Sequence, residues 1–398
     1  MLLLLLLSLA CPSPTPTETG GTADETLTYY RDVKPVLDRS CVRCHTDLGT
    51  APSFADPADV VALASAIAGY VQAGAMPPAA PDPTCRDYEN SDRYVLSDAD
   101  RTTLLDWAAT GAALGDSAAQ VDGPGAIASL GPFDAELRGS PYTPSFGADG
   151  NDYRCFVLPV GNPSPAFLTG LEALVDRPEI VHHVVLFEPA GVSEAQRAPE
   201  GFSCSGFGEA GWGVVGAWAS GGTPLWFPEG VGYPIRAEAE LVLQMHYFNS
   251  FDGADQIADQ SGYGLLLADS VEREVGTVPY GPTGFSIPAG SDDLEVTDTN
   301  RYRGDAAEIL AVFPHMHEAG VGFRMSVEGE TDACLVDMDG WYFHNQLLPV
   351  FTEPFPLNPG DKVTTTCVYD NASDQAVGFG EETGNEMCFG FAWVTPAE

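Results

Sequence analysis

Short strand-like runs broken by turn-forming residues fill the chain after about residue 150, and this feature most limits its fold. Gly, Pro, Asn or Asp residues separate each apolar run from the next. Such spacing is typical of antiparallel sandwiches, and no long helical period interrupts it. The clearest runs are 154–160, 180–188, 240–247, 308–313, 362–369 and 388–394. We therefore predict a mainly β fold for this part of the chain.

Length and charge limit the function classes. A chain of 398 residues, 44% of them hydrophobic, can fill the cores of about two or three domains. The 43 Gly and 32 Pro residues favour many turns. The formal net charge of -40 opposes binding to nucleic acid, and to an anionic lipid surface by charge alone, because like charges repel.

The amino terminus has the pattern of an export signal. Residues 2–10 form an apolar run that ends before Cys11, well short of the roughly 20 residues of a membrane-spanning helix. A small residue before a cysteine is typical of a lipoprotein signal, here 1–11, in which Cys11 becomes lipidated. An ordinary cleaved signal is the alternative. Residues 12–26 predict a flexible tether. We expect an exported, lipid-anchored protein of the periplasm or cell envelope.

Export would place the remaining cysteines in an oxidising compartment. Of nine cysteines, those at positions 11, 41 and 44 have other predicted roles, which leaves an even number. The others are Cys85, Cys155, Cys204, Cys334, Cys367 and Cys388. Disulfides are the default prediction, although spacing alone leaves about fifteen pairings open.

Residues 27–117 predict a small all-α unit. One helix begins after Asp56, carries apolar residues at helical spacing and stops at Gly74. A second helix is capped by Ser97 and carries a further apolar face. Gly, Pro and Ala dominate much of 118–145, which predicts a linker to the β-rich part.

Cys41, Cys44 and His45 form a Cys-x-x-Cys-His motif within this unit. Two thiols at this spacing can meet the two vinyl groups of haem c, and the following histidine reaches the iron. Met76 is the candidate for the other axial ligand, with a core methionine as the alternative. A redox Cys-x-x-Cys or half of a zinc ribbon would use the same thiols, but no second Cys-x-x-Cys exists to complete four ligands. We predict a cytochrome c-like unit.

The remaining histidines fall mostly in pairs. His315 and His317 stand two residues apart in a strand-like run, so both side chains would leave one face and could bind one ion. His182 and His183 would alternate between faces, unless a bend or strand end brings both to one ion with His246. A lone buried histidine such as His246 is more often a hydrogen-bonded core residue. Metal binding is the favoured role of the His315 and His317 pair.

Four separated motifs occur in a fixed order: His-His, Gln-x-His-Tyr, His-x-His and Glu-Met-Cys, the last at 386–388. With flanking text such as Phe-Pro-Glu-Gly-Val-Gly at 227–232, they resemble the copper type II, ascorbate-dependent monooxygenases, which include peptidylglycine- and dopamine β-hydroxylating enzymes. The resemblance covers about residues 150–396. It implies two antiparallel, jelly-roll-like β-sandwiches that face each other across a cleft, here 146–275 and 276–398.

The resemblance also implies two copper ions with unlike ligands. The electron-transfer copper would be held by three imidazoles, those of His182, His183 and His246. The oxygen-activating, catalytic copper would be held by two imidazoles and a thioether, from His315, His317 and Met387. A soft thioether favours Cu(I), the state that meets dioxygen.

The disulfides that the resemblance implies are Cys155–Cys204 and Cys367–Cys388. Cys85 and Cys334 are left over. They would either pair across domains or remain free thiols.

The chain departs from the peptide-amidating members near the second copper. Those members place an arginine two residues before His-x-His to hold a carboxylate, whereas this chain has Phe313 there, and Phe389 and Phe391 after the methionine. Burying an unpaired carboxylate is costly. We therefore expect a small-molecule substrate that is apolar or aromatic rather than a peptidylglycine.

The predicted function is a copper monooxygenase that hydroxylates a substrate C–H bond with O2. Electrons would come from ascorbate or from the fused haem c unit, which a periplasmic electron donor would supply. The alternative is an exported copper and haem protein that binds copper or transfers electrons without hydroxylating anything. A zinc hydrolase with three histidines is a further alternative.

Overall fold

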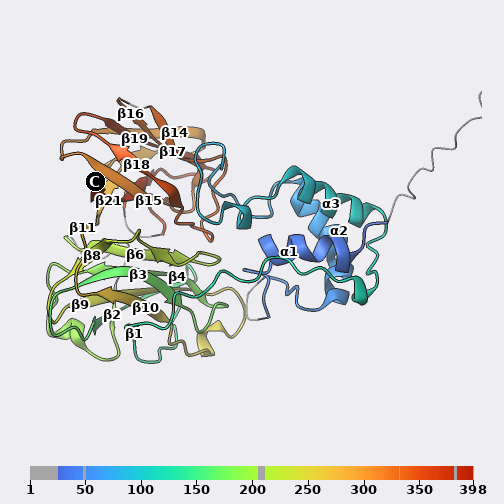
Figure 1. The fold of residues 1–398 in the computed structure, drawn as a ribbon, viewed down its shortest axis with the longest axis horizontal. Helices are drawn as coiled ribbons and strands as arrows, with labels where there is room; N and C mark the ends of the chain where they lie inside the picture. The colour runs from blue at the N-terminus through green and yellow to red at the C-terminus, as the bar shows by residue number, and fades with distance from the viewer. Residues whose placement is uncertain (1–25, 48–50, 205–210, 331, 381–382, 398) are drawn as a thin grey trace, which may run out of the picture.

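The computed structural model describes residues 26–47, 51–204, 211–330, 332–380 and 383–397. The predicted signal 1–11, with its lipidation site Cys11, lies outside them. Figure 1 shows a helical unit beside two stacked β units, the first coloured mainly green to yellow and the second orange to red. Among the described helices, none has the length and apolar character needed to cross a membrane.

The helical unit contains both predicted helices. Asp56 accepts a hydrogen bond from the N–H of Ala58 at 2.8 Å, and Ser97 accepts one from the N–H of Asp100 at 3.1 Å. These caps explain where α2 and α3 begin, because each satisfies a backbone donor that lacks an intrahelical partner. Trp107 of α3 is fully buried among the helices. The helices are η1 (Tyr29–Val33), α1 (Lys34–Ser40), α2 (Pro57–Gln72), η2 (Ser91–Arg93), α3 (Asp98–Ala109) and η3 (Ser117–Ala119).

The first β unit consists of two sheets packed around one core. One sheet is antiparallel with the order β5-β2-β9-β4-β6; the other has the order β1-β10-β3-β8-β11, with β7 paired to β3 and β11 parallel to β8. Its strands are β1 (Ala135–Arg138), β2 (Asn151–Pro159), β3 (Ala166–Leu174), β4 (Val181–Glu188), β5 (Phe202–Ser203), β6 (Gly213–Ala219), β7 (Leu225–Trp226), β8 (Val231–Ile235), β9 (Glu240–Phe248), β10 (Gly262–Ala268) and β11 (Arg273–Glu274). Short helices η4 (Ala195–Arg197) and η5 (Ala254–Gln256) lie between strands.

The predicted linker 118–145 needs a correction. Its residues 135–138 form β1, which pairs with β10 at the edge of the first β unit. Leu137 is buried in the core of that unit. Nearby Gly and Pro residues favoured a linker in the sequence. The register of β1 is set by β10, which follows more than 100 residues later, so the strand depends on a distant segment.

The second β unit is likewise built from two sheets. Both are antiparallel and four-stranded, with the orders β12-β21-β15-β18 and β14-β19-β16-β17. A small β13-β20 pair accompanies them. Its strands are β12 (Gly276–Tyr280), β13 (Ser286–Ile287), β14 (Ser291–Arg301), β15 (Ala307–His315), β16 (Gly320–Glu328), β17 (Ala333–Met338), β18 (Val350–Leu357), β19 (Lys362–Asn371), β20 (Val377–Gly378) and β21 (Phe389–Pro396). The six predicted runs overlap β2, β4, β9, β15, β19 and β21, so the mainly β prediction is confirmed.

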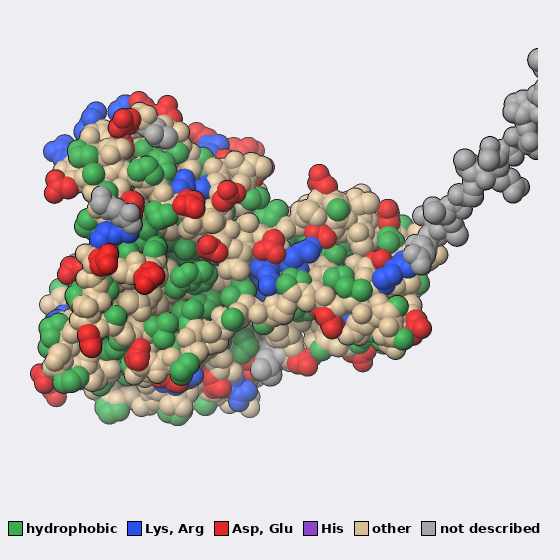
Figure 2. All heavy atoms as spheres, viewed as in Figure 1, with side chains coloured by type: hydrophobic (Ala, Val, Ile, Leu, Met, Phe, Trp, Pro, Cys, Tyr) green, Lys and Arg blue, Asp and Glu red, His purple; other side chains and the backbone are tan. Residues whose placement is uncertain are grey.

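The two β units share a continuous apolar interface. The indole N–H of Trp393 donates to the carbonyl of Val215 at 3.2 Å, and the hydroxyl of Thr277 donates to the carbonyl of Val214 at 2.7 Å. Phe313 and Phe391 of the second unit belong to the same buried cluster as the first unit's core. Hydrophobic side chains gather along the seam between the two units on the face seen in Figure 2. The units are therefore held face to face.

The described part of the chain contains three disulfides. The structure contains both pairs that the family resemblance implies, Cys155–Cys204 and Cys367–Cys388. Cys85 pairs with Cys334, across 249 positions of sequence, and so joins the segment between α2 and α3 to the second β unit. This settles the question left open by the sequence in favour of pairing across domains. Three disulfides indicate an oxidising compartment and hence an exported protein.

Candidate metal centres

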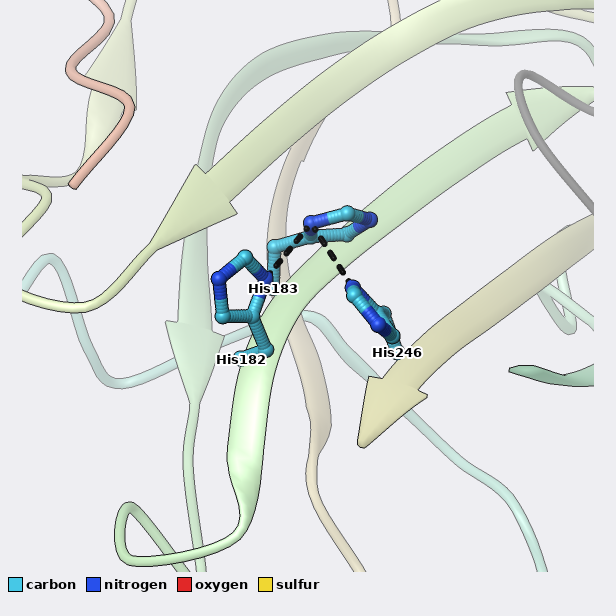
Figure 3. Close-up of side chains that lie close together, drawn as sticks. All are labelled: His182, His183 and His246. Carbon is cyan, nitrogen blue, oxygen red and sulfur yellow. Dashed lines mark hydrogen bonds between the residues drawn. The ribbon is translucent and has the colours of Figure 1, made fainter. Parts of the chain in front are cut away.

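A β-bulge in β4 brings the adjacent histidines of the first β unit together. Val181 pairs with Tyr247 of β9 and His183 pairs with His246, so His182 is an extra residue in the ladder. A bulge bends its strand and re-aims a side chain, which overrides strict alternation. Figure 3 shows the three imidazoles turned toward one another. Their candidate ligand atoms all lie within 4.8 Å of one another.

Nδ1 is the inward nitrogen of these rings. Nδ1 of His183 lies 3.2 Å from Nδ1 of His182 and 3.4 Å from Nδ1 of His246. On the outer side, Nε2 of His246 lies 2.7 Å from Oδ1 of Asn151, whose NH2 group donates to the carbonyl of Asp149. Since Oδ1 can only accept, Nε2 of His246 carries the proton and its Nδ1 keeps a lone pair. Lone pairs converging at this spacing fit a bound cation.

Burial keeps these three rings neutral, which is the form that binds a metal. It lowers the pKa of His182 and of His246 well below the usual histidine value, and lowers the pKa of His183 to about 3. The neighbouring imidazoles lower the pKa values further, because two positive rings would repel each other.

The second pair lies at the end of a strand rather than along it. His315 is the last residue of β15, and His317 lies beyond it in the turn to β16, so the prediction of a shared strand face needs correction. The chain leaves the ladder there because the backbone N–H of His317 donates to the carboxylate of Glu386 rather than to a neighbouring strand. The rings of His315 and His317 still approach to a centroid distance of 5.1 Å.

Nε2 is the nitrogen left for a metal at this second pair. Nδ1 of His315 lies 2.7 Å from Oε1 of Gln346, whose NH2 group donates to the carbonyl of Phe343. Nδ1 of His317 donates to the carbonyl of Asn385 at 2.9 Å. Both acceptors are oxygens, so both Nδ1 atoms carry the proton and each Nε2 keeps its lone pair. The two histidine groups therefore offer opposite ring nitrogens.

Glu386 joins the main chain of Met387 to that of His317. One carboxylate oxygen accepts from the N–H of His317 at 2.9 Å and from the N–H of Met387 at 3.3 Å, and the other accepts from the N–H of Ala319 at 2.6 Å. Burial raises the pKa of Glu386 to about 7, and these three donors oppose that rise. Met387 is 4% exposed. The residue is thus held beside the second pair through its backbone.

Two aromatic residues connect the histidine groups across the interface. The ring of Phe343, from the second unit, lies 4.9 Å from that of His182 and 6.2 Å from that of His317. Tyr153 of β2 stacks on His246 at 4.0 Å, and its hydroxyl lies 2.8 Å from Oγ1 of Thr383 in the second unit. Both groups therefore lie at one buried seam.

The Cys-x-x-Cys-His motif lines a cavity of about 620 Å³ where the helical unit meets both β units. Cys41, Cys44, His45 and Met76 all contribute to its wall, as does His182. Nδ1 of His45 donates to the carbonyl of Pro52 at 2.7 Å, so Nε2 of that ring keeps its lone pair. The volume lies within the range of roughly 300–1,000 Å³ found for cofactor pockets. The motif residues therefore fit a haem.

The thiols of this motif differ from the other described cysteines, all of which are in disulfides. Cys41 and Cys44 are free although they are three residues apart. Burial raises the pKa of the Cys41 thiol to about 12. A redox Cys-x-x-Cys needs a lowered thiol pKa, so this environment disfavours that alternative.

Sequence reasoning missed the residues that orient the histidines. Asn151, Gln346 and Asn385 supply acceptors for outer ring nitrogens, and no local pattern marks them because each contact joins distant parts of the chain. His344 belongs to none of the motifs described above, and its Nδ1 lies 2.7 Å from Nε2 of His182. Only the folded arrangement reveals these partners.

Comparison with known proteins gives two family matches in the same regions. Residues 144–253 match the N-terminal domain, and residues 286–394 the C-terminal domain, of the copper type II ascorbate-dependent monooxygenases. Together they cover both histidine groups. The matches do not extend over the helical unit.

Among curated relatives, DBH-like monooxygenase protein 2 of Mus musculus is 28% identical over 251 residues, which is 56% of this chain and 39% of that protein. Tyramine beta-hydroxylase of Caenorhabditis briggsae is 26% identical over 247 residues, 55% of this chain and 40% of that protein. The chain thus spans about two fifths of the length of these relatives. A solved infectious bursal disease virus VP2 subviral particle has 14% identity and a TM-score of 0.20, with 66% of this chain and 73% of that chain covered, too low to indicate a shared fold.

Both family domains are present, in order, and each contains one of the two histidine groups. The chain belongs to the copper type II ascorbate-dependent monooxygenase family.

Proposed function

We propose that this protein is an exported copper monooxygenase that hydroxylates a C–H bond of a small apolar or aromatic molecule. In the proposed reaction, O2, the substrate, two electrons and two protons give the hydroxylated product and one water. The observation that carries the proposal is the pair of buried histidine groups at one seam, with Nδ1 atoms converging in the first and Nδ1 atoms held by oxygen acceptors in the second.

His182, His183 and His246 would hold one copper ion, and His315, His317 and Met387 the other. When bound, the first copper would exchange electrons and the second would react with O2. Three imidazoles form a borderline donor set that suits both oxidation states, whereas a thioether favours Cu(I). Met387 also distinguishes this proposal from a zinc hydrolase, because a thioether is a poor partner for zinc.

The chain's own residues would orient the ligands and exclude water. Asn151 fixes the outer nitrogen of His246, and Gln346 and Asn385 fix those of His315 and His317. These contacts set the ring tautomers before any metal arrives, so little reorganisation is needed on binding. Phe343 fills the space beside both groups and is 7% exposed.

The aromatic side chains near His315 support this substrate class. Phe391 lies 6.5 Å and Phe313 lies 6.0 Å from that ring, and Phe389 lies 5.6 Å from Phe391. A carboxylate near these rings would lose its hydration without gaining a partner, which favours an apolar or aromatic substrate. The relatives' names include a tyramine hydroxylase, and a compact aromatic substrate agrees with that name.

The helical unit would carry haem c on Cys41 and Cys44, with His45 and Met76 as axial ligands. It would act as a built-in electron donor to the first copper, and a periplasmic protein would supply electrons to its haem. Ascorbate would be the other reductant. A lipid on Cys11 would be the membrane attachment. The acidic surface makes nucleic acid an unsuitable partner.

The test is oxygen labelling with the full, copper-loaded chain. A panel of small aromatic and aliphatic compounds is incubated with ¹⁸O2 and ascorbate, and the products are analysed by mass spectrometry. The proposal predicts one ¹⁸O atom per product molecule and no product with zinc in place of copper. Reversible copper reduction without any labelled product across the panel would favour the copper-binding and electron-transfer alternative.

The role of haem needs a separate test. The protein is loaded with copper, its haem is reduced without oxygen, and O2 and substrate are then added while the haem spectrum is followed. Oxidation of the haem with product formation is expected. A haem that stays reduced while ascorbate alone supports turnover would remove the helical unit from the electron path.

A further inference from the structure

One loop of the second β unit touches every candidate centre. We call residues 341–346 the bridging loop; it follows β17 and precedes β18. Trp341 donates from its indole N–H to the carbonyl of His317 at 3.1 Å, and Gln346 accepts from His315. Phe343 and His344 lie against His182 of the first unit. The loop therefore connects the two histidine groups.

His344 of this loop contacts the three-histidine group and also lines the haem-sized cavity. Its Nδ1 lies 2.7 Å from Nε2 of His182. Its ring packs edge-on against His182 at 4.8 Å and lies 5.0 Å from Phe248. His344 also lines the cavity to which Cys44 and His45 contribute. One side chain thus touches a candidate copper ligand and the wall of the candidate haem site.

We propose that His344 is a positioning residue that fixes the ring of His182 for metal binding and couples the haem cavity to the three-histidine centre. The proposal rests on the function proposed above. It adds a residue that neither family resemblance nor motif spacing assigned.

The hydrogen bond has a defined direction once His182 binds a metal through Nδ1. Nε2 of His182 must then carry the proton, and Nδ1 of His344 must accept it. The acceptor holds the ring plane of His182 and increases the basicity of its inner nitrogen, as outer partners of metal-bound histidines do. A more basic ligand stabilises Cu(II) relative to Cu(I). Loss of the acceptor should therefore raise the reduction potential of this copper.

The same contact provides a short covalent and hydrogen-bonded path from the cavity wall to the copper ligand. The step it would serve is the transfer of one electron, in which ferrous haem becomes ferric and Cu(II) becomes Cu(I). The step forms and breaks no covalent bond and moves no proton. His182 also lines the cavity, so His344 adds a hydrogen-bonded route beside the direct approach of that ring to the haem site.

The test compares His344→Leu with His344→Gln in the full chain carrying haem and copper. Leucine fills similar space without a hydrogen-bond acceptor, whereas the amide oxygen of glutamine can still accept from His182. Copper affinity and the Cu(II) electron paramagnetic resonance spectrum are measured in a His317→Ala background, so that the signal reports the three-histidine centre. Haem oxidation by Cu(II) is followed without oxygen by stopped flow, and haem content and thermal unfolding check folding.

His344→Leu is expected to weaken copper binding at the three-histidine centre by ~10–100-fold, which is typical when an outer partner is removed. It should also change the Cu(II) spectrum, raise the copper potential and slow haem oxidation by about tenfold or more at full copper loading. His344→Gln should recover affinity and spectrum to near those of the parent chain. A His344→Leu protein with parental affinity, spectrum and electron-transfer rate would overturn the proposal, and so would a His344→Gln protein as impaired as His344→Leu.

The parent chain separates this inference from the proposed function. If the parent chain gives no labelled product or no haem oxidation, the monooxygenase proposal or its haem branch fails. The role of His344 is still tested in that case, because the copper affinity and the Cu(II) spectrum of each variant are compared with those of the parent chain. A change confined to unfolding temperature, with unchanged copper properties, would make His344 a packing residue and reject the positioning role.

Discussion

The two candidate copper centres are built in different ways. The three-histidine centre lies within one sheet, where paired strands β4 and β9 supply every ligand. The second centre combines the end of β15, the turn after it and the segment before β21, and its orienting contacts come from two loops. The first centre is therefore set by sheet register and one bulge, whereas the second depends on contacts between segments far apart in the sequence.

This difference has a functional meaning. A centre that only exchanges electrons benefits from rigid ligands, because little reorganisation then accompanies each change of oxidation state. A centre that must admit O2 and substrate needs an approach path, and loops at a strand end provide one. The comparison predicts that changes to β4 and β9 affect the first centre alone. Changes to the loop residues that contact His315 and His317 affect the second centre, and His344 is the loop residue proposed to act on the first.

The largest effect should come from removing one ligand at each centre. His183→Ala and His317→Ala should each reduce bound copper from about two ions per chain to about one, because two remaining neutral donors hold copper weakly. Elemental analysis after dialysis measures the content. Hydroxylation should fall by more than the ~10–100-fold expected for outer partners. Loss of both ions from either single variant would show that the centres are not independent.

Met387→Leu should affect the second centre next most strongly. Leucine keeps the volume but removes the sulfur, so Cu(I) affinity should fall more than Cu(II) affinity. Copper X-ray absorption should lose its sulfur signal. Met316→Leu is the matched control, because Met316 is also buried and stands between His315 and His317 in the sequence. A sulfur signal that persists in Met387→Leu and vanishes in Met316→Leu would reassign the thioether ligand.

Replacing the residues that accept hydrogen bonds from the outer ring nitrogens should change copper affinity less, and at one centre only. Asn151→Ala should weaken copper binding at the first centre, and Gln346→Ala at the second, each by ~10–100-fold, because the ring each one orients loses its acceptor. Competition with a copper chelator measures both affinities. Asn151→Asp and Gln346→Glu keep an acceptor oxygen and serve as controls. If both alanine variants weakened the same centre, the separation of the two sites would be wrong.

The smallest effect on copper is expected from the disulfide between Cys85 and Cys334. Replacing both with serine should lower the free energy of unfolding by ~2–4 kcal/mol. Copper content should stay unchanged, because neither cysteine is a candidate ligand or one of the residues that orient the histidines. Urea unfolding and elemental analysis measure the two quantities. Replacing Cys367 and Cys388 is the contrast, since Cys388 follows Met387 directly and its loss should disturb the second centre.

Features that depend on contacts between residues close in the sequence were predicted well. The start of α2 followed from Asp56 and the start of α3 from Ser97, since each caps its own helix. The six strand-like runs became strands because their apolar residues fill sheet cores. The conditional prediction of a bend at His182 and His183 was also confirmed, although the sequence could not identify it as a bulge, because a bulge is defined by the partner strand β9.

Contacts between distant segments were beyond the sequence. Cys85 could be matched with Cys334 only once the helical unit was placed against the second β unit. His317 was expected on the strand and lies beyond it, because Glu386 draws its backbone out of the ladder. The partners Gln346 and His344 come from a loop with no motif of its own.

Diffraction at the copper absorption edge, from crystals of the copper-loaded protein, tests the central claim most directly. The account predicts two separate copper peaks in the difference between anomalous maps collected just above and just below the edge, a difference that removes the contribution of haem iron. One should lie among the Nδ1 atoms of His182, His183 and His246, and the other should contact Nε2 of His315 and His317 and the sulfur of Met387. A single peak, or a second peak away from that sulfur, would contradict two unlike copper centres facing one seam.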